Sequence, residues 1–113
     1  MDAKRWRKKI KQSAEESGTY RPFFDPVIKT LAEILEDRDR AREEWLAAGG
    51  SSVIETDKGM TKNPRMTAYN DLNTTALAYW RDLGLTPKGL KAIDEQAMKP
   101  KKKSALAEIL KDL

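Results

Sequence analysis

Residues 62–87 read KNPRMTAYNDLNTTALAYWRDLGLTP, and this stretch carries the pattern of one long helix with a signal at each end. Asn63 is suited to the N-cap, since its side-chain oxygen can accept a hydrogen bond from an unpaired N–H of the first turn. Pro64 then takes the first helical position, where it has no donor to lose and its φ is already helical. Gly84 should end the helix, because glycine adopts the left-handed conformation at least cost. The sequence therefore predicts a helix over about residues 64–83.

The apolar residues of this helix fall three or four positions apart, which places them on one face. They are Tyr69, Leu72, Ala76, Trp80 and Leu83. An earlier segment begins at Asp25-Pro26, a second cap-then-proline pattern, and carries apolar residues near heptad spacing to about residue 48. We therefore expect an all-α fold, built on an antiparallel helical hairpin (about 26–48 and 64–83) with short flanking helices.

The connection between the two long helices is rich in turn-forming residues. The run Gly49-Gly50-Ser51-Ser52 ends the first helix, and Asp57 to Gly59 supply turn chemistry inside 53–61. A two-stranded ribbon is marginally stable by itself. We therefore expect either a small β-hairpin or an ordered loop over 53–61.

The composition indicates one small domain with tails and argues against an enzyme. Of 113 residues, 39% are apolar and 35% are charged, and a core this small favours oligomerisation. The chain has no cysteine and no histidine, which removes thiolate ligands and the usual general base. We expect no catalytic residue, no metal site and no cofactor. With neither an apolar run of membrane-spanning length nor an apolar signal region, a cytoplasmic location is expected.

The net charge of +4 is concentrated at the two ends of the chain. Within residues 1–12, six basic residues stand against Asp2 alone and mark an N-terminal arm (1–18). A helical oligomerisation domain (19–98) follows, and lysines recur in a linker and C-terminal helix (99–113). Cations clustered in this way are typical of contacts with a polyanion. The candidate DNA-binding residues are Lys4, Arg5, Arg7, Lys8, Lys9, Lys11, Lys101, Lys102 and Lys103.

Asn63-Pro64, the amphipathic helix and the run Leu83-Gly84-Leu85-Thr86-Pro87 together resemble the small subunit of tailed-phage terminases, over about residues 25–93. The resemblance implies a non-catalytic packaging component that binds double-stranded viral DNA at the packaging start. It also implies assembly as a ring and recruitment or regulation of the large subunit, which holds the ATPase and nuclease activities. The family usually carries arginines shortly after the Thr-Pro, where this chain has Leu90 and Ala92.

The apolar residues of the hairpin occupy more than one helix face, which favours a cyclic homo-oligomer. Two arginines interrupt the first stripe, either as a solvated, ion-paired face or as partners of a neighbour's carboxylate. The candidates for core and oligomerisation are Leu31, Ile34, Leu35, Arg38, Arg42, Trp45, Leu72, Ala76, Leu77 and Trp80.

Residues 104–113 have the pattern of a short amphipathic helix that Ser104 can cap. A helix of this length is marginal alone, so its apolar face needs a partner. That partner is either the large subunit, by a helix-in-groove mode, or the chain's own ring. The candidate contacts are Leu106, Ile109, Leu110 and Leu113.

Two other functions compete with the terminase interpretation. In a helix-turn-helix regulator, residues 66–83 and 87–97 would be the two helices. The second helix is a poor reader of DNA, because Asp94 repels phosphate and Gln96 alone could reach a base edge. A short helix that folds back to pack Leu90 and Ile93 is the better interpretation there. A generic helical oligomerisation module with basic tails is the other alternative.

Overall fold

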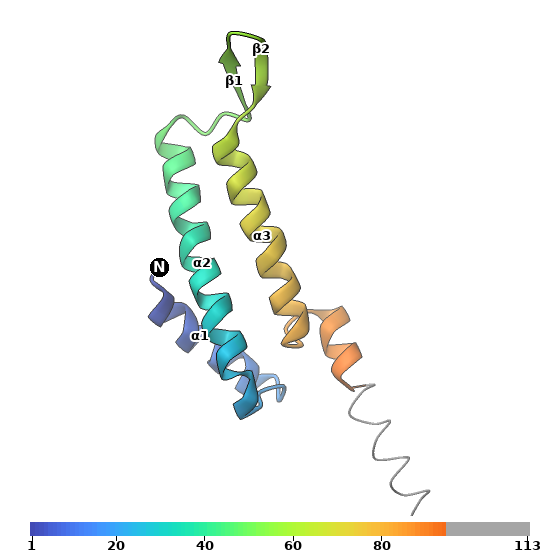
Figure 1. Ribbon diagram of the computed structural model, residues 1–113. Coiled ribbons are helices and arrows are strands. Elements are labelled where there is room, and N and C mark those ends of the chain that lie inside the picture. The colour runs from blue at the N-terminus through green and yellow to red at the C-terminus, as the bar shows by residue number, and fades with distance from the viewer. Residues whose placement is uncertain (95–113) are drawn as a thin grey trace, which may run out of the picture.

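The structure, a computed structural model, describes residues 1–94, which form several helices and one β-hairpin (Figure 1). The α-helices are α1 (Ala3–Glu16), α2 (Asp25–Ala47) and α3 (Pro64–Asp82), and a short 3-10 helix, η1 (Pro22–Phe24), leads into α2. The strands β1 (Val53–Thr56) and β2 (Gly59–Lys62) form an antiparallel pair between α2 and α3. The chain is helical again from residue 87 to 94. This architecture confirms the predicted fold, and the 53–61 segment is a β-hairpin.

Helices α2 and α3 run antiparallel and side by side, as predicted (Figure 1). The Asn63 side chain accepts a hydrogen bond from the Arg65 N–H at 3.0 Å, with Pro64 in the first turn. At the other end Gly84 has φ +74°, and its N–H donates to the Arg81 carbonyl oxygen at 2.9 Å. The predicted cap, proline and terminating glycine are all present.

The start of α2 differs from the sequence-based expectation that Asp25 caps it. Phe24 occupies the N-cap position, and no side chain caps this end. Because η1 immediately precedes α2, Asp25 already has helical dihedral angles and cannot act as a cap. Its carboxylate instead accepts a hydrogen bond from the Tyr20 hydroxyl at 2.8 Å. That bond, together with burial, raises the pKa of Tyr20.

The core lies where α1, α2 and the C-terminal end of α3 meet. Its buried residues come from all three elements: Ile10, Ile28, Leu31, Ala32, Leu35, Ala76 and Leu83. Side chains that are partly buried pack around them, among them Trp6 and Tyr20. The N-terminal helix is thus packed against the helical hairpin.

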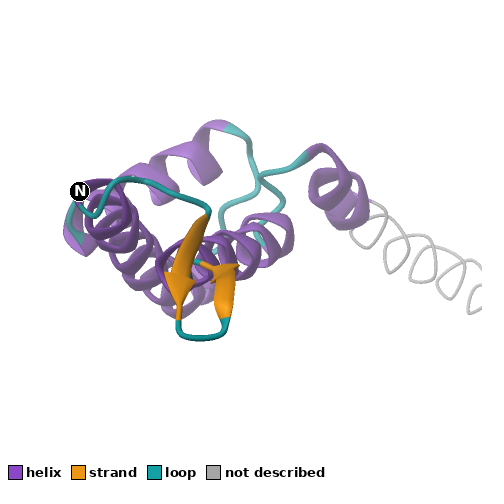
Figure 2. Cartoon of the chain, turned by 90° about the horizontal axis from the view of Figure 1, so that it is seen from above, coloured by secondary structure: helices purple, strands orange, loops and turns teal. Residues whose placement is uncertain are grey.

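The β-hairpin projects beyond the ends of α2 and α3 (Figures 1 and 2). Val53 pairs with Lys62 at its base, and the register ends at Thr56 opposite Gly59. The carbonyl oxygen of Ser51 holds this base, because it accepts from the Trp45 indole N–H at 2.8 Å and the Asn63 amide at 2.9 Å. The side chain of Asn63 therefore caps α3 and anchors the hairpin at once.

Candidate functional site

The solvent-facing side of α1 carries the predicted N-terminal DNA-binding residues. Trp6, Ile10 and Ala14 lie four residues apart and face the core. The cations occupy other positions in the first three turns of the helix, and each of them is exposed: Lys4, Arg5, Arg7, Lys8, Lys9 and Lys11. None of these side chains forms an ion pair within residues 1–94. We call these six residues the basic face.

A polar cluster on α2 holds the start of α1 in place. The Trp6 indole N–H donates to Asp39 at 2.8 Å, and the Arg38 guanidinium donates to the other carboxylate oxygen at 2.9 Å. The same guanidinium lies 5.3 Å from the centre of the Trp6 ring. Burial alone would raise the pKa of Asp39, but the hydrogen bonds from Trp6 and Arg38 lower it below its ordinary value. The Ala3 N–H also donates to Glu36 at 2.6 Å.

These contacts show what Trp6 and Arg38 do in the folded chain. The indole of Trp6 docks α1 onto α2, so it is not a free stacking platform. Arg38 is engaged within its own chain by Asp39 and by the Trp6 ring. The orientation of the basic face is consequently fixed relative to the helical hairpin of α2 and α3.

A lysine that the sequence analysis did not single out extends the basic face onto α2. Lys4 and Arg7 line a shallow groove of about 170 Å³ between α1 and α2 together with Lys29. Glu33 is the acidic residue of this groove. Lys29 lies 22 positions from Arg7 in the sequence, so no local pattern connects the two residues. The antiparallel packing of α1 on α2 brings them together.

Five of the ten candidates for core and oligomerisation belong to this chain's own core or pack against it. Leu31, Leu35 and Ala76 are buried, and the half-buried ones are Ile34, Trp45, Leu72 and Trp80. Ile34, a candidate for core or oligomerisation, packs against the internal core. Leu77 is 51% exposed, so its side chain remains on the surface.

Arg42 lies farther along α2, where it contacts an aromatic pair. Its guanidinium is 5.5 Å from the centre of the Tyr69 ring and donates to the Tyr69 hydroxyl at 3.4 Å. Tyr69 in turn stacks on Trp45 with ring centres 6.0 Å apart. A hydrogen bond with Asn73, followed by the Arg42 contact, lowers the pKa of Tyr69. No carboxylate of residues 1–94 pairs with Arg42.

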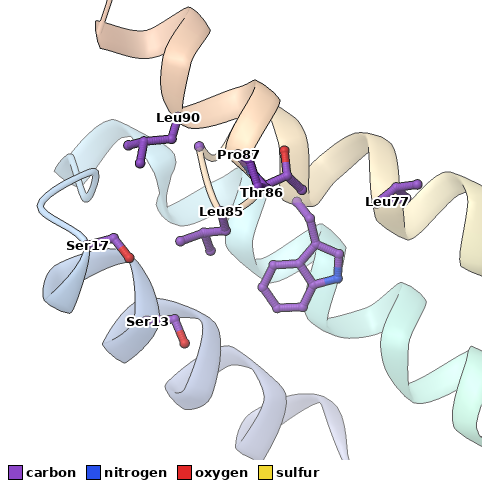
Figure 3. A pocket seen from close by; sticks show the side chains of 9 residues that line it. Ser13, Ser17, Leu77, Leu85, Thr86, Pro87 and Leu90 are labelled. Carbon is purple, nitrogen blue, oxygen red and sulfur yellow. The ribbon is translucent and has the colours of Figure 1, made fainter.

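An apolar groove of about 760 Å³ lies between the C-terminal ends of α1 and α3 (Figure 3). Leu77 and Leu90 line it and are 51% and 37% exposed. Trp80 and Leu85 contribute further apolar surface, and Ser13 and Ser17 line it from the α1 side. We call this the α1–α3 groove. It therefore combines Leu77 and Trp80, which are candidates for oligomerisation, with residues of the run Leu-Gly-Leu-Thr-Pro at 83–87.

The remaining candidates lie outside the described residues: the lysines 101–103 and the apolar residues Leu106, Ile109, Leu110 and Leu113. Within residues 1–94, no cluster of histidine, cysteine, aspartate or glutamate is suited to a metal ion. In the same range, no helix is long and apolar enough to cross a membrane.

The described part of the chain is thus a helical fold with an exposed cationic face on α1. The family model described as phage terminase, small subunit, matches residues 3–105. The chain therefore belongs to the phage terminase small subunit family, whose role is in DNA packaging and whose members are generally non-catalytic. DNA and the terminase large subunit are the general partners of this family. A search of the curated proteins and a search of the solved structures each gave no match.

Proposed function

We propose that this protein is a non-catalytic small terminase subunit that binds double-stranded viral DNA at the packaging start in the host cytoplasm. It assembles as a cyclic homo-oligomer and recruits or regulates the large subunit that holds the ATPase and nuclease. The observation that carries this proposal is the basic face: six exposed cations on one docked helix, in a chain of the terminase small subunit family.

The basic face suits phosphate contacts for two reasons. Cations that are free of internal ion pairs can neutralise phosphates without first breaking bonds within the protein. The helix that carries them is also held by the core and by Asp39, so less conformational freedom is lost when DNA binds. Lys9 and Lys11 lie near the rings of Trp6 and Tyr20, at 5.9 and 5.2 Å. The other four cations are the stronger candidates for direct contacts.

Assembly as a ring would multiply these contacts by raising the effective concentration of each basic face near the DNA. The α1–α3 groove supports a seam between copies, because its exposed Leu77 and Leu90 leave apolar surface in water. Arg42 supports the seam too, since it has no carboxylate partner within residues 1–94. We propose that a neighbouring subunit covers the groove and supplies a carboxylate to Arg42.

We further propose that the C-terminal residues Leu106, Ile109, Leu110 and Leu113 contact the large subunit. Four aliphatic side chains at helical spacing suit a helix-in-groove interaction. Lys101, Lys102 and Lys103 precede them and are proposed to add to the DNA contacts.

A charge-removal experiment tests the DNA interface. The test variant carries Lys4→Ala, Arg5→Ala and Lys8→Ala, three exposed positions of α1. The control variant carries Lys58→Ala, Arg65→Ala and Lys91→Ala, which remove the same charge from exposed positions elsewhere. Duplex binding is measured by fluorescence anisotropy over a range of salt, and assembly by native mass spectrometry.

The test variant should weaken binding and lower the slope of log K against log salt by about one unit for each phosphate contact removed. The control should change both much less, and both variants should keep the wild-type oligomer mass. Equal binding by the wild type and the test variant would refute the basic face as the DNA interface. A monomeric wild type at micromolar concentration would refute the ring.

A further inference from the structure

A second concave site, separate from the α1–α3 groove, lies between η1 and the helix at residues 87–94. Its volume is about 470 Å³, which is within the usual range for a site that holds a small ligand. Apolar side chains contribute most of its lining: Phe23, Phe24, Ala92 and Ile93. We call this the η1 groove.

Phe23 is the most exposed large apolar residue of the groove. Its side chain is 72% exposed, although its ring meets that of Phe24 edge-on, with centres 4.7 Å apart. An exposed phenylalanine at the border of an apolar hollow is typical of a surface that binds another chain. Aromatic residues are also enriched among the side chains that dominate binding energy.

The rim of the η1 groove is mostly cationic. Arg21, Arg81 and Lys88 line it, with Asp82 as the acidic residue. Within residues 1–94, none of the three cations forms an ion pair. The Arg21 guanidinium is oriented by the carbonyl oxygen of Tyr20, to which it donates at 2.7 Å. An apolar floor with a positive rim complements a ligand that is apolar in the middle and acidic around it.

Two glycines allow the wall of the groove to form. A Cβ atom at Gly89 would collide with the carbonyl oxygen of Arg81, so the helix at 87–94 rests directly on the end of α3. A Cβ atom at Gly84 would lie 2.5 Å from a methyl carbon of Ile93. The Thr86 hydroxyl accepts from the Gly89 N–H at 3.0 Å and caps the helix. The groove is therefore formed before a ligand arrives, which reduces the entropy lost on binding.

We propose that the η1 groove binds an acidic segment of a second protein that places one large apolar side chain among carboxylates. The source of that segment rests on the proposed function, under which the second protein is the terminase large subunit. Duplex DNA is disfavoured as the ligand, since phosphate contacts do not need an apolar hollow. The chain's own C-terminal residues are disfavoured as well. Their lysines at 99 and 101–103 carry the same sign of charge as Arg81 and Lys88, and like charges repel.

The first experiment measures binding of a fluorescein-labelled peptide, Asp-Glu-Glu-Phe-Glu-Asp-Glu, to the full chain. Two further peptides are matched to it: one replaces the phenylalanine with alanine, and the other replaces every acidic residue with lysine. Each change should weaken binding by about tenfold or more, because it removes either the apolar anchor or the charge match. Equal binding of the three peptides, or no binding of the first, would overturn the proposal.

The second experiment locates the site with a protein variant that carries Arg81→Glu and Lys88→Glu. A control with Lys58→Glu and Arg65→Glu makes the same charge change at the hairpin end of the molecule. Both pairs are exposed, so the fold should be retained. The rim variant should lose at least about tenfold in affinity for the acidic peptide, and the control should lose little. Loss in the control alone would place the peptide elsewhere and overturn the assignment.

The third experiment separates this inference from the proposed function by measuring binding of the purified large subunit to the same variants. If the wild type does not bind the large subunit, the proposed function fails. If the wild type and the rim variant bind it equally, the groove inference alone fails. A rim variant that keeps the large subunit but loses duplex DNA would assign the groove to DNA and also overturn the proposal.

Discussion

Replacing Ile10 with alanine tests whether α1 is part of the folded core or a detachable arm. Ile10 is fully buried and packs in a cluster with Leu31 and Leu35 of α2. The substitution removes three carbon atoms, which at about 0.8 kcal/mol for each buried methylene corresponds to about 2.4 kcal/mol. The cavity left behind adds to this, so the free energy of unfolding should fall by about 2–5 kcal/mol.

The measurement is urea and thermal unfolding followed by far-ultraviolet circular dichroism. All proteins are compared at one concentration, because association makes apparent stability depend on concentration. In a domain of this size, each kcal/mol lowers the Tm by about 4–8 °C. The matched control is Lys8→Ala on the exposed side of the same helix, which should stay within about 0.5 kcal/mol of the wild type.

An Ile10→Ala protein as stable as the Lys8→Ala control would refute the docked helix. The basic face would then be a free arm, and its fixed orientation would no longer explain DNA binding. A different result is that Ile10→Ala loses stability as expected but still binds DNA like the wild type under conditions in which it is folded. That result would show that the anchoring of α1 does not contribute to the phosphate contacts.

Three further predictions concern the anchor, the groove wall and the tail. Asp39→Asn should lower stability near neutral pH by about 1–3 kcal/mol, because Trp6 and Arg38 lose a charged acceptor. Since the folded-state pKa of Asp39 is lowered, the wild type holds this stabilisation above the unfolded pKa of about 3.9 and loses it as pH falls through the folded pKa. Between about pH 6 and 2, the urea midpoint of the variant should therefore fall less steeply than that of the wild type. Parallel curves for the two proteins would refute a stabilising role of the ionised Asp39 carboxylate. Gly89→Ala should displace the helix at 87–94 from α3 and lower the Tm, with exposed Lys91→Ala as the unaffected control. Deleting residues 104–113 should abolish stimulation of the large subunit and leave the oligomer mass and the Tm unchanged. A smaller oligomer or a lower Tm would show instead that this segment stabilises the assembly.

Local sequence signals were sufficient to predict the two long helices and the position of the connection between them. Asn63, Pro64 and Gly84 fixed the ends of α3 through local hydrogen bonding and backbone preference, which depend on a few adjacent residues. The same local reasoning was wrong at Asp25, because the 3-10 turn that precedes it gives this residue helical dihedral angles before any cap is needed. For residues 53–61 the sequence allowed either a β-hairpin or an ordered loop. The structure has a β-hairpin, and hydrogen bonds among Ser51, Trp45 and Asn63 hold its base.

The positions of the candidate binding surfaces, in contrast, depend on how the helices pack against one another. The cations of α1 were visible in the sequence, but their fixed orientation depends on Trp6 meeting Asp39, which is 33 residues away. Lys29 joins Lys4 and Arg7 for the same reason, since antiparallel packing brings together positions that share no local pattern. The η1 groove likewise combines Phe23 from before α2 with Arg81 from the end of α3. Periodicity reports which face of a helix is apolar, whereas the identity of the facing side chain depends on how the helices pack.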